Sequence, residues 1–196
     1  DVITGDTFTL TRDECQFGYR DSRFKRAEAK HWVVTHVHFW LANDIAPVTA
    51  YAELAVLDNP TPEEIFNKVI EVRQQKLPDP AVLGNAGSFF KNPTITTIEY
   101  ETLKKSHPTI PGFVVNDQQV KVPAAWLIDN AGFKGQCIDG ACCYHRQPLV
   151  LVNQHHATGE ALLTLARAIQ HKVSQLFSVT LAPEVRLLGK QGRIEL

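Results

Sequence analysis

The chain has 196 residues, of which 44% are hydrophobic and 21% charged, and its formal net charge is −1. This composition is typical of a globular protein that buries a core, and it excludes an intrinsically disordered chain. The near-zero charge gives no overall field that favours nucleic acid or a membrane surface, and no apolar run reaches the ~18–20 residues of a membrane span. With no signal peptide and only 4 cysteines, we expect a cytoplasmic protein. We also expect a monomer. The chain has no methionine, even at position 1, so we expect it to be a piece of a longer protein.

The first part of the chain is rich in residues that favour strands. We expect short strands at Val2–Leu10 and Cys15–Phe17, separated by polar turns. His31–Leu41 has the clearest alternation, because every second residue shares one face of an extended chain. That face would carry Val33, Thr35, Val37, Phe39 and Leu41. The sequence therefore predicts a strand over 31–41.

After residue 60 the pattern changes to helices mixed with short strands. Thr61, Pro62 and Glu64 form a capping box with proline at the first helical position, which predicts a helix to about Lys76. Further helices are predicted at 96–105, at 123–130 and from Thr158 onward. Strands are predicted at 113–115 and 119–121 as a hairpin, and at 142–145, 149–152 and 184–188. The fold class is α+β, with a domain boundary around residues 52–60.

Several common site motifs are missing from the sequence. His36 and His38 share a strand face with two tryptophans, and two ligands do not make a metal site, so we expect none. Cys142 and Cys143 are adjacent and face opposite sides of a strand, and Cys137 lies five residues earlier. Because no C-x-x-C spacing exists, we expect buried free thiols. The phosphate loop, the G-x-S-x-G elbow and the dinucleotide fingerprint are also absent.

The run from Gly84 to Pro93 reads G-N-A-G-S-F-F-K-N-P, and its apolar residues follow neither a strand nor a helix period. Glycine permits positive φ and a close approach of another molecule to the backbone, so the hydroxyl of Ser88 is expected to point into open space. By itself, the run indicates a turn that leads into a short strand.

Three other features carry charge in places where a site could form. Tyr19–Ser22 is a polar bend whose arginine can pair with a carboxylate, and Pro183–Arg186 holds a carboxylate among apolar residues. Lys76–Pro80 presents a cation at a helix C-terminus just before the glycine-containing run. Each feature alone indicates a surface ion pair or a turn, so it is their combination that suggests a site.

In this order along the chain, these segments resemble the family of UDP-N-acetylenolpyruvoylglucosamine reductases, also called UDP-N-acetylmuramate dehydrogenases. The resemblance rests on motifs spread over almost the whole chain: Tyr19–Ser22, Arg73 with Lys76–Pro80, Gly84–Pro93, Ala125–Asp129 and Pro183–Arg186. It implies that residues 1–55 are the C-terminal part of an FAD-binding domain. Residues 56–196 would then form a UDP-sugar substrate-binding domain, and the rest of the FAD-binding region would lie outside this chain.

The resemblance also implies a reaction and a set of site residues. The family reduces UDP-N-acetylglucosamine enolpyruvate with FAD as cofactor and NADPH as reductant. By resemblance, Ser88 donates the proton, while Arg20 and Glu184 flank the substrate carboxylate. Substrate-binding roles are implied for Tyr51, Lys76, Asn92, Lys134 and Gln147. Cofactor-binding roles are implied for Tyr19, Arg73 and Arg186, with Arg186 on the same strand face as Glu184. Phe113 and Pro148 depart from the family pattern, where tyrosine and glutamine can occur.

Two other hypotheses belong to different classes of protein. The chain could be a UDP-sugar-binding module without redox function, and we expect it to be inactive as an enzyme when alone. A serine hydrolase that uses Ser88 with His145 and Glu184 is a further alternative, but its serine lacks a nucleophile elbow.

Overall fold

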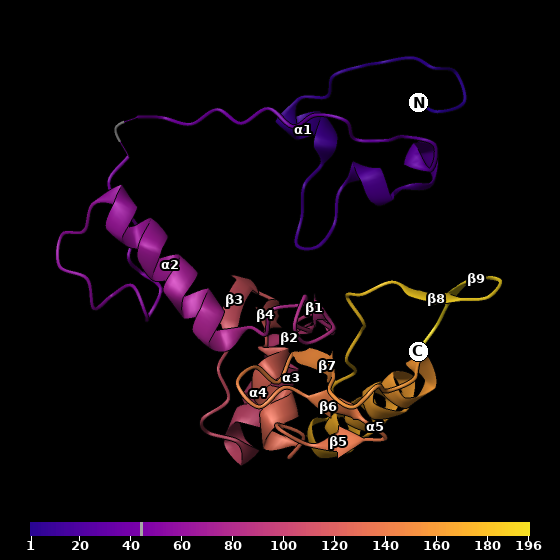
Figure 1. Cartoon of the computed structure of the whole chain (residues 1–196). Coiled ribbons are helices and arrows are strands. Elements are labelled where there is room, and N and C mark those ends of the chain that lie inside the picture. The colour runs from indigo at the N-terminus through magenta and orange to yellow at the C-terminus, as the bar shows by residue number, and fades with distance from the viewer. Residues whose placement is uncertain (44) are drawn as a thin grey trace. The chain divides into compact units, whose positions relative to one another are not determined.

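The computed structural model describes residues 1–43 and 45–196, and it separates into two units, Asp1–Ala46 and Pro47–Leu196 (Figure 1). The class is α+β, as the sequence predicts. Among the described residues, no helix is both long enough and apolar enough to cross a membrane.

The first unit contains short helical turns and almost no β-structure in its described residues. Helix α1 (Arg12–Cys15) begins at a capping box in which Thr11 and Glu14 exchange hydrogen bonds, and it is followed by the 3₁₀ turns η1 (Arg23–Lys25) and η2 (Ala27–Ala29). The aromatic rings of Phe8 and Trp32 lie 4.8 Å apart, edge to face.

The strands predicted at Val2–Leu10, Cys15–Phe17 and His31–Leu41 are wrong for this structure. A strand needs a neighbour for its backbone N–H and C=O groups, and in residues 1–43 the pairing is one isolated bridge between Gly18 and Asp21. Alternation in the sequence describes two faces of an extended chain, but it does not supply that neighbour.

The second unit begins with a turn at 51–57 and helix α2 (Pro62–Lys76). The predicted capping box is present, because Glu64 accepts from the backbone N–H of Thr61 at 2.8 Å and donates its own N–H to the Thr61 hydroxyl. Helix α2 ends at Lys76, as predicted, but none of its residues is buried. The side chain of Phe66, for example, is 64% exposed.

A small antiparallel sheet follows, in the order β2–β4–β3, with strands β2 (Thr94–Thr96), β4 (Gln119–Lys121) and β3 (Phe113–Asn116). The predicted hairpin is thus confirmed, since β3 and β4 pair directly. Helix α3 (Thr97–Ser106) begins at a second capping box, formed by Thr96 and Glu99.

The main sheet has four antiparallel strands in the order β1–β7–β6–β5. Its strands are β1 (Asn85–Ser88), β7 (Val150–Asn153), β6 (Ala141–Cys143) and β5 (Cys137–Ile138). Helix α5 (Gly159–Phe177), capped by Thr158, packs on β5 and β6 (Figure 1). Helix α4 (Ala124–Asn130) packs against α5.

The main core lies between this sheet and the helices. The largest fully buried side chains of that core include Phe90, Leu127, Ile128, Leu165, Ile169 and Leu181. The opposite face of the sheet carries a second, smaller cluster of Cys142, Val150 and Val152, against which Leu77, Leu83 and Tyr144 pack. The sheet therefore has one face that supports the core and one that supports the residues before β1.

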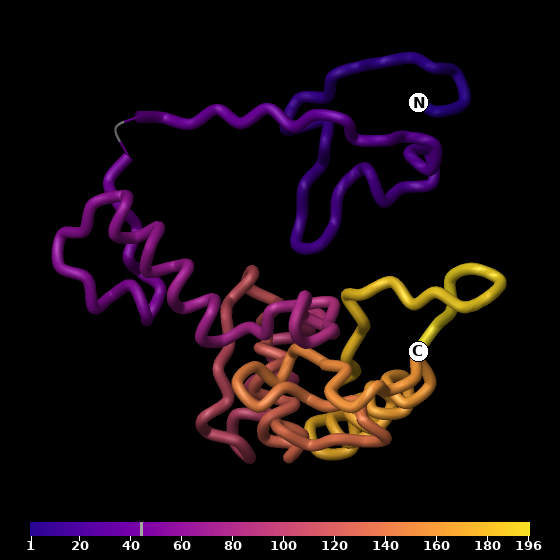
Figure 2. Tube along the Cα trace, viewed as in Figure 1, coloured from indigo at the N-terminus to yellow at the C-terminus, as the bar shows by residue number. Residues whose placement is uncertain are grey.

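The C-terminal segment ends in a hairpin of β8 (Leu187–Gly189) and β9 (Gly192–Ile194), seen as the yellow loop in Figure 2. The strand predicted at Glu184–Leu188 is therefore wrong in part, because regular strand geometry begins only at Leu187. The backbone before it instead makes an irregular contact with the Phe89–Lys91 segment. The expectation that Glu184 and Arg186 share one strand face fails for the same reason.

Candidate functional site

Strand β1 carries Ser88 and is not regular. Asn85 pairs with Val152 and Ser88 with Val150, so three steps on β1 match two on β7 and the strand contains a bulge. Gly87 has φ +72°, and a Cβ added there would meet no atom within 4 Å. The expected positive φ is therefore confirmed at Gly87, while the expectation that the Ser88 hydroxyl points into open space stays a prediction.

The bulge determines which way Ser88 faces. Residues directly opposite each other on antiparallel strands project from the same face of the sheet. Ser88 therefore shares a face with Val150, and Asn85 shares it with Val152. Since both valines belong to the smaller cluster, Ser88 lies on the face of the sheet opposite α5.

Asn85 holds the bulge in place through its side chain. Its Nδ2 donates to the Leu83 carbonyl at 2.8 Å and to the Pro78 carbonyl at 3.3 Å, while its Oδ1 accepts from the Gly87 N–H at 3.0 Å. The sequence-based interpretation missed this residue. An asparagine two positions before a glycine is the pattern of an Asx-turn, and that signal could have identified it.

Glu184 is brought next to Ser88 along the backbone. The N–H of Glu184 donates to the Phe89 carbonyl at 2.8 Å, and the Lys91 N–H donates to the Ala182 carbonyl at 2.9 Å. Ser88 and Glu184 thus flank the same residue, and both are half-buried. The sequence-based hypothesis places these two residues in one site, and the structure brings their backbones together.

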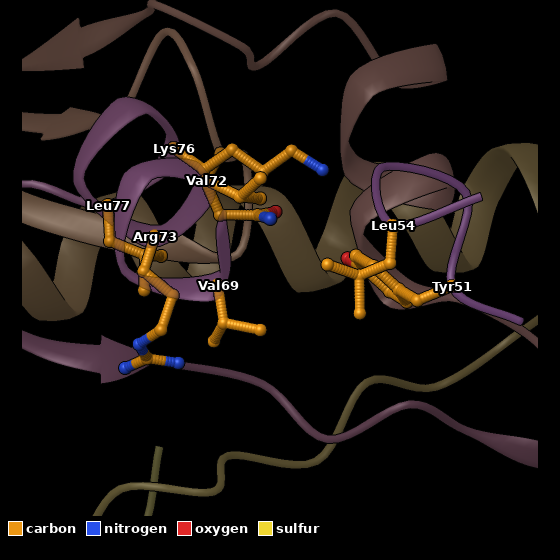
Figure 3. A pocket seen from close by; sticks show the side chains of 8 residues that line it. Tyr51, Leu54, Val69, Val72, Arg73, Lys76 and Leu77 are labelled. Atoms are coloured by element: carbon orange, nitrogen blue, oxygen red, sulfur yellow. The ribbon is translucent and has the colours of Figure 1, made fainter. Parts of the chain in front are cut away.

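A pocket of about 310 Å³ forms between α2, the turn at 51–57 and the loop before β7. Its lining residues are Tyr51, Leu54, Val69, Val72, Arg73, Lys76, Leu77 and Gln147 (Figure 3). Four of the residues that resemblance assigned to the site, Tyr51, Arg73, Lys76 and Gln147, therefore line one cavity, although the sequence separates them by almost 100 positions. The whole lining belongs to the second unit.

Lys76 is one of two cationic residues in the lining of this pocket. Its ammonium lies 5.6 Å from the centre of the Tyr51 ring and forms an ion pair with Glu53. Figure 3 shows its side chain extending toward the Tyr51 and Leu54 side of the pocket. A cation held by an aromatic face and a single carboxylate remains able to bind a further anion.

Two further predicted substrate-binding residues, Asn92 and Lys134, and the predicted cofactor-binding residue Arg186 lie outside the pocket lining. Asn92 accepts, through Oδ1, a hydrogen bond of 2.9 Å from the N–H of Ala124, the first residue of α4. Lys134 pairs with Asp129 at 3.1 Å. Arg186 is exposed in the segment before β8. Asn92 thus has a structural contact at the start of α4, while its predicted role and those of Lys134 and Arg186 remain predictions.

Tyr19 and Arg20 belong to the first unit. Gly18 and Asp21 exchange backbone hydrogen bonds of 2.9 and 3.3 Å, which puts Tyr19 and Arg20 at the tip of a tight turn. Arg20 has φ +52°, and the ammonium of Lys25 donates to its carbonyl. The predicted polar bend is confirmed, and the roles of its two tip residues stay predictions.

The prediction that the cysteines are free thiols is wrong for two of them. Cys137 is disulfide-bonded to Cys142, because the β5–β6 register places them directly opposite each other. Cys15 and Cys143 are free and buried, as predicted. Burial raises the pKa of the Cys143 thiol to about 12, which keeps it protonated and unreactive.

The serine hydrolase hypothesis depends on a contact between Ser88 and His145. Ser88 lies on β1, whereas His145 is exposed in the loop that follows β6, with its Cβ 3.8 Å from a Cβ built at Gly135. Within the described residues, no hydrogen bond joins the Ser88 hydroxyl to that imidazole. The geometry therefore gives the hydrolase hypothesis no support.

Comparison with known proteins identifies the family. Residues 79–188 match the family described as "UDP-N-acetylenolpyruvoylglucosamine reductase, C-terminal domain". The chain is 48% identical over 194 residues to a UDP-N-acetylenolpyruvoylglucosamine reductase of Pseudoalteromonas atlantica, covering 99% of this chain and 56% of that protein. For the proteins of the same name from Pasteurella multocida and Escherichia coli K12, the identities are 44% and 41%, covering 98% and 99% of this chain and 57% of each relative.

The chain therefore spans a little more than half the length of the curated relatives that it matches. The matched family region contains Ser88, Asn92, Gln147 and Glu184, and the similarity to the relatives extends over nearly all remaining positions. The predicted resemblance is confirmed: the chain belongs to the UDP-N-acetylenolpyruvoylglucosamine reductase family.

Proposed function

We propose that this chain is the substrate-binding part of a flavin-dependent oxidoreductase of the cytoplasm. That enzyme would reduce UDP-N-acetylglucosamine enolpyruvate to UDP-N-acetylmuramate, a step in the synthesis of peptidoglycan precursors. The observation that carries the proposal is the convergence of predicted residues in the second unit. Tyr51, Lys76 and Gln147 line one pocket, and Ser88 lies beside Glu184. Family membership supports the identity of the substrate.

Ser88 is the proposed proton donor. Hydride added to the β-carbon of the enolpyruvyl group leaves negative charge on the α-carbon, which the neighbouring carboxylate shares. A serine hydroxyl is too weak an acid for most bases at neutral pH, but a carbanion-like carbon is basic enough to take its proton. The bulge at Gly87 supports this role, because the backbone there is uncrowded and another molecule can approach it closely.

Glu184 and Arg20 are proposed to interact with the carboxylate of the substrate and with the negative charge that it shares. The guanidinium of Arg20 would supply fixed positive charge to the dianionic species that forms after hydride addition. Glu184 is proposed on the opposite side of that carboxylate. Its backbone bond to Phe89 supports a position within reach of the group that Ser88 protonates.

Lys76 is proposed to bind the diphosphate of the nucleotide sugar. Its ammonium is a compact charge that suits phosphate oxygens, and Tyr51 offers a flat face for a ring of the ligand. Lys134 and Asn92 are proposed as further contacts. The closeness of Lys76 to both Tyr51 and Glu53 supports an ammonium group that is already held in place in the pocket lining.

The proposed cofactor is FAD, held mainly by the part of the relatives that this chain does not cover. Bound reduced flavin, recharged by NADPH, supplies the hydride. Arg186, Arg73 and Tyr19 are the residues of this chain proposed to contact it. The exposure of Arg186, two residues after Glu184, fits a contact with a polar group of the cofactor.

Titration of the 196-residue chain with UDP-N-acetylglucosamine by calorimetry tests the binding part of the proposal. We expect binding that Lys76→Ala weakens about tenfold or more, since a lost charge–phosphate contact is worth 1.4 kcal/mol or above. Lys68→Ala is the matched control, because Lys68 lies on the same helix and pairs with Glu71 at 2.9 Å. An equal loss in both variants would contradict a specific role for Lys76.

Activity of the full-length protein tests the chemical part. With Ser88→Ala, we expect the substrate still to oxidise reduced flavin while formation of the reduced product slows by at least about 100-fold, the usual size of a general-acid contribution. Ser106→Ala, at the exposed end of α3, is the control. Unchanged product formation by Ser88→Ala would remove Ser88 as the acid.

A second candidate function is a UDP-sugar-binding module without redox activity. The specific observation that favours it is that the whole pocket lining lies in the second unit. We expect the 196-residue chain alone to oxidise no NADPH, and a flavin absorbance band in the purified chain would contradict that expectation. Binding without flavin would support the module, and no binding would mean that the rest of the enzyme completes the site.

A further inference from the structure

The hairpin of β5 and β6 contains a chemically distinctive pair of residues that the proposed reaction does not use. Cys137 and Cys142 lie opposite each other and are bonded, with their Cα atoms 4.0 Å apart. We propose that this pair is a reversible thiol–disulfide site, opened and closed by exchange with small thiols and disulfides of the glutathione class. The proposal is independent of the reductase function.

The turn of the hairpin explains why the two sulfurs meet. Asp139 and Gly140 have φ +46° and +84°, and Ile138 pairs with Ala141, so the connection is a two-residue turn of the Asp-Gly kind. One step beyond the cysteine pair, the N–H of Cys143 donates to the Gln136 carbonyl at 2.9 Å. Cys137 and Cys142 thus occupy a non-hydrogen-bonded position, where side chains of opposite strands come closest.

The bond contributes little to holding the hairpin together. The turn already fixes the register, and β6 also pairs with β7 over three residues. A cross-link that closes a loop of only a few residues removes little entropy from the unfolded chain. Breaking the bond therefore leaves the strand pairing intact, as a reversible site requires.

The two cysteines differ in exposure. Cys137 is exposed on β5, the end strand of the sheet, whereas Cys142 is 2% exposed. An incoming thiolate attacks the sulfur of Cys137 and forms a mixed disulfide with it. The bond to Cys142 breaks, and Cys142 leaves as a thiolate that takes a proton from water.

A second thiolate completes the reduction. It attacks the outer sulfur of the mixed disulfide, releases a small disulfide and leaves Cys137 as a thiol, so two small thiols become one small disulfide while the protein disulfide becomes two thiols. Oxidation is the reverse sequence, with glutathione disulfide as the oxidant. Because Cys142 lies directly opposite, it closes the mixed disulfide at Cys137 faster than a free thiol in solution can.

The other two cysteines do not compete for this exchange. The sulfur of Cys143 lies 3.2 Å from the Pro148 carbonyl and belongs to the core on the α5 side of the sheet. Its thiol stays protonated because burial raises its pKa to about 12. Cys15 is buried in the first unit. The exchange is thus confined to the β5–β6 pair.

Peptide mapping after equilibration in glutathione buffers tests the proposal on the full chain. After acid quenching, unfolding and alkylation, one tryptic peptide, Gly135–Arg146, carries all three cysteines of the region. In oxidised glutathione we expect this peptide to lack two hydrogens and to carry one alkyl group, and in reduced glutathione to carry three. The same oxidised fraction must be reached from both directions. Three alkyl groups in oxidised glutathione, or a bond that reduced glutathione does not open, would overturn the proposal.

Variants identify the bonded pair. Cys143→Ala, the matched control, should still form the bond. Cys142→Ser should abolish it and leave Cys137 as a stable mixed disulfide with glutathione. In the folded, reduced chain, Cys137 should be alkylated at least about tenfold faster than Cys142, because Cys137 is an exposed residue and Cys142 is buried. Loss of the bond in Cys143→Ala, with an unchanged circular dichroism spectrum, would assign the bond to the wrong partner and refute the proposal.

Discussion

In the first unit, the buried apolar residues among those described are Cys15 and Ala29, while Phe39, Trp40 and Leu41 are each about four-fifths exposed or more. In the second unit, α5 alone buries six side chains against a four-stranded sheet. Both units are rich in apolar residues arranged with regular periods. The difference between them is the presence of a second layer, because an apolar face becomes a core only where another element covers it.

The same contrast appears inside the second unit. Helices α2 and α5 both show an apolar stripe in the sequence and both begin at a threonine cap. Helix α5 packs on β5 and β6, whereas α2 buries no residue and contributes Val69, Val72 and Lys76 to the wall of a pocket. An uncovered stripe on a helix is therefore compatible with a ligand-facing surface as well as with a core.

The largest predicted effect compares two leucine truncations. Leu165 is fully buried under the sheet, so Leu165→Ala should lower the free energy of unfolding by about 3 kcal/mol. Leu41 is 80% exposed, and Leu41→Ala should change the free energy of unfolding by less than about 0.5 kcal/mol. Urea unfolding followed by far-ultraviolet circular dichroism measures both. Similar losses would mean that the first unit is covered in solution, and the comparison would fail.

A smaller effect is expected for two glycines with positive φ. Gly87 has φ +72° and Gly5 has φ +78°, and an added Cβ at either would touch nothing within 4 Å. Gly87→Ala should cost about 1 to 2 kcal/mol, because alanine is strained in the left-handed region and the paired strand cannot relax. Gly5→Ala should leave the free energy of the same unfolding transition almost unchanged, because the turn that contains Gly5 is held by few contacts. Thermal unfolding of the two variants would distinguish these outcomes, and equal shifts in midpoint would contradict them.

Two identical capping boxes provide the next comparison. Thr96 caps α3, which buries Tyr100, and Thr11 caps α1, which has four residues. Thr96→Ala should cost about 1 kcal/mol in global unfolding. Thr11→Ala should leave the main transition unchanged, since α1 is outside the second unit's core. The midpoints of urea unfolding, compared at an unchanged dependence of the free energy on urea concentration, measure both effects. A loss of unfolding free energy for Thr11→Ala as large as for Thr96→Ala would show that the two units unfold together.

The smallest effect concerns pH. The backbone N–H and then the hydroxyl of the capping threonine lower the pKa of Glu99 below its ordinary value of 4.5, and the same bonds from Thr11 lower that of Glu14. Because the folded pKa is depressed, the stabilising contribution is present above pH 4.5 and is lost as the pH falls through the folded value. Carboxyl titration by NMR should show the pKa of Glu99 rising only part of the way toward its ordinary value in Thr96→Ala, because the hydroxyl is lost while the backbone N–H of residue 96 still donates. An unaltered pKa in that variant would contradict a contribution from the hydroxyl.

Sequence signals that act over a few residues predicted the second unit well. The threonine caps at Thr61, Thr96 and Thr158 locate three helices, and the ends of β3 and β4 match the predicted hairpin within two residues. The fold class and the closeness of Lys76 to Tyr51 also agree with expectation. The family resemblance, rather than any periodicity, brought Tyr51 and Gln147 into one hypothesis.

Signals that depend on distant partners failed. The strand predicted at His31–Leu41 needed a neighbour that alternation cannot reveal. The disulfide was missed because it depends on the register of β5 against β6, which the Asp139–Gly140 turn sets. The structural contacts of two asparagines were also not predicted: the Asn85 side chain accepts from the Gly87 N–H, and the Asn92 side chain accepts from the Ala124 N–H.

Side chains along a strand alternate between the two faces of the sheet, and the bulge in β1 shifts that alternation by one residue. Without it, three steps from Asn85 would place Ser88 on the α5 face, and every later residue up to Phe90 would exchange sides. Deleting Ala86 would straighten the strand and still leave Ser88 opposite Val150, because the extra residue and the bulge would disappear together. The number of residues that the bulge holds between Asn85 and Ser88 thus determines which face of the sheet the hydroxyl projects from. A one-residue deletion preserves that face, whereas a substitution that forces Gly87 into a regular extended conformation, without changing the length, reverses it.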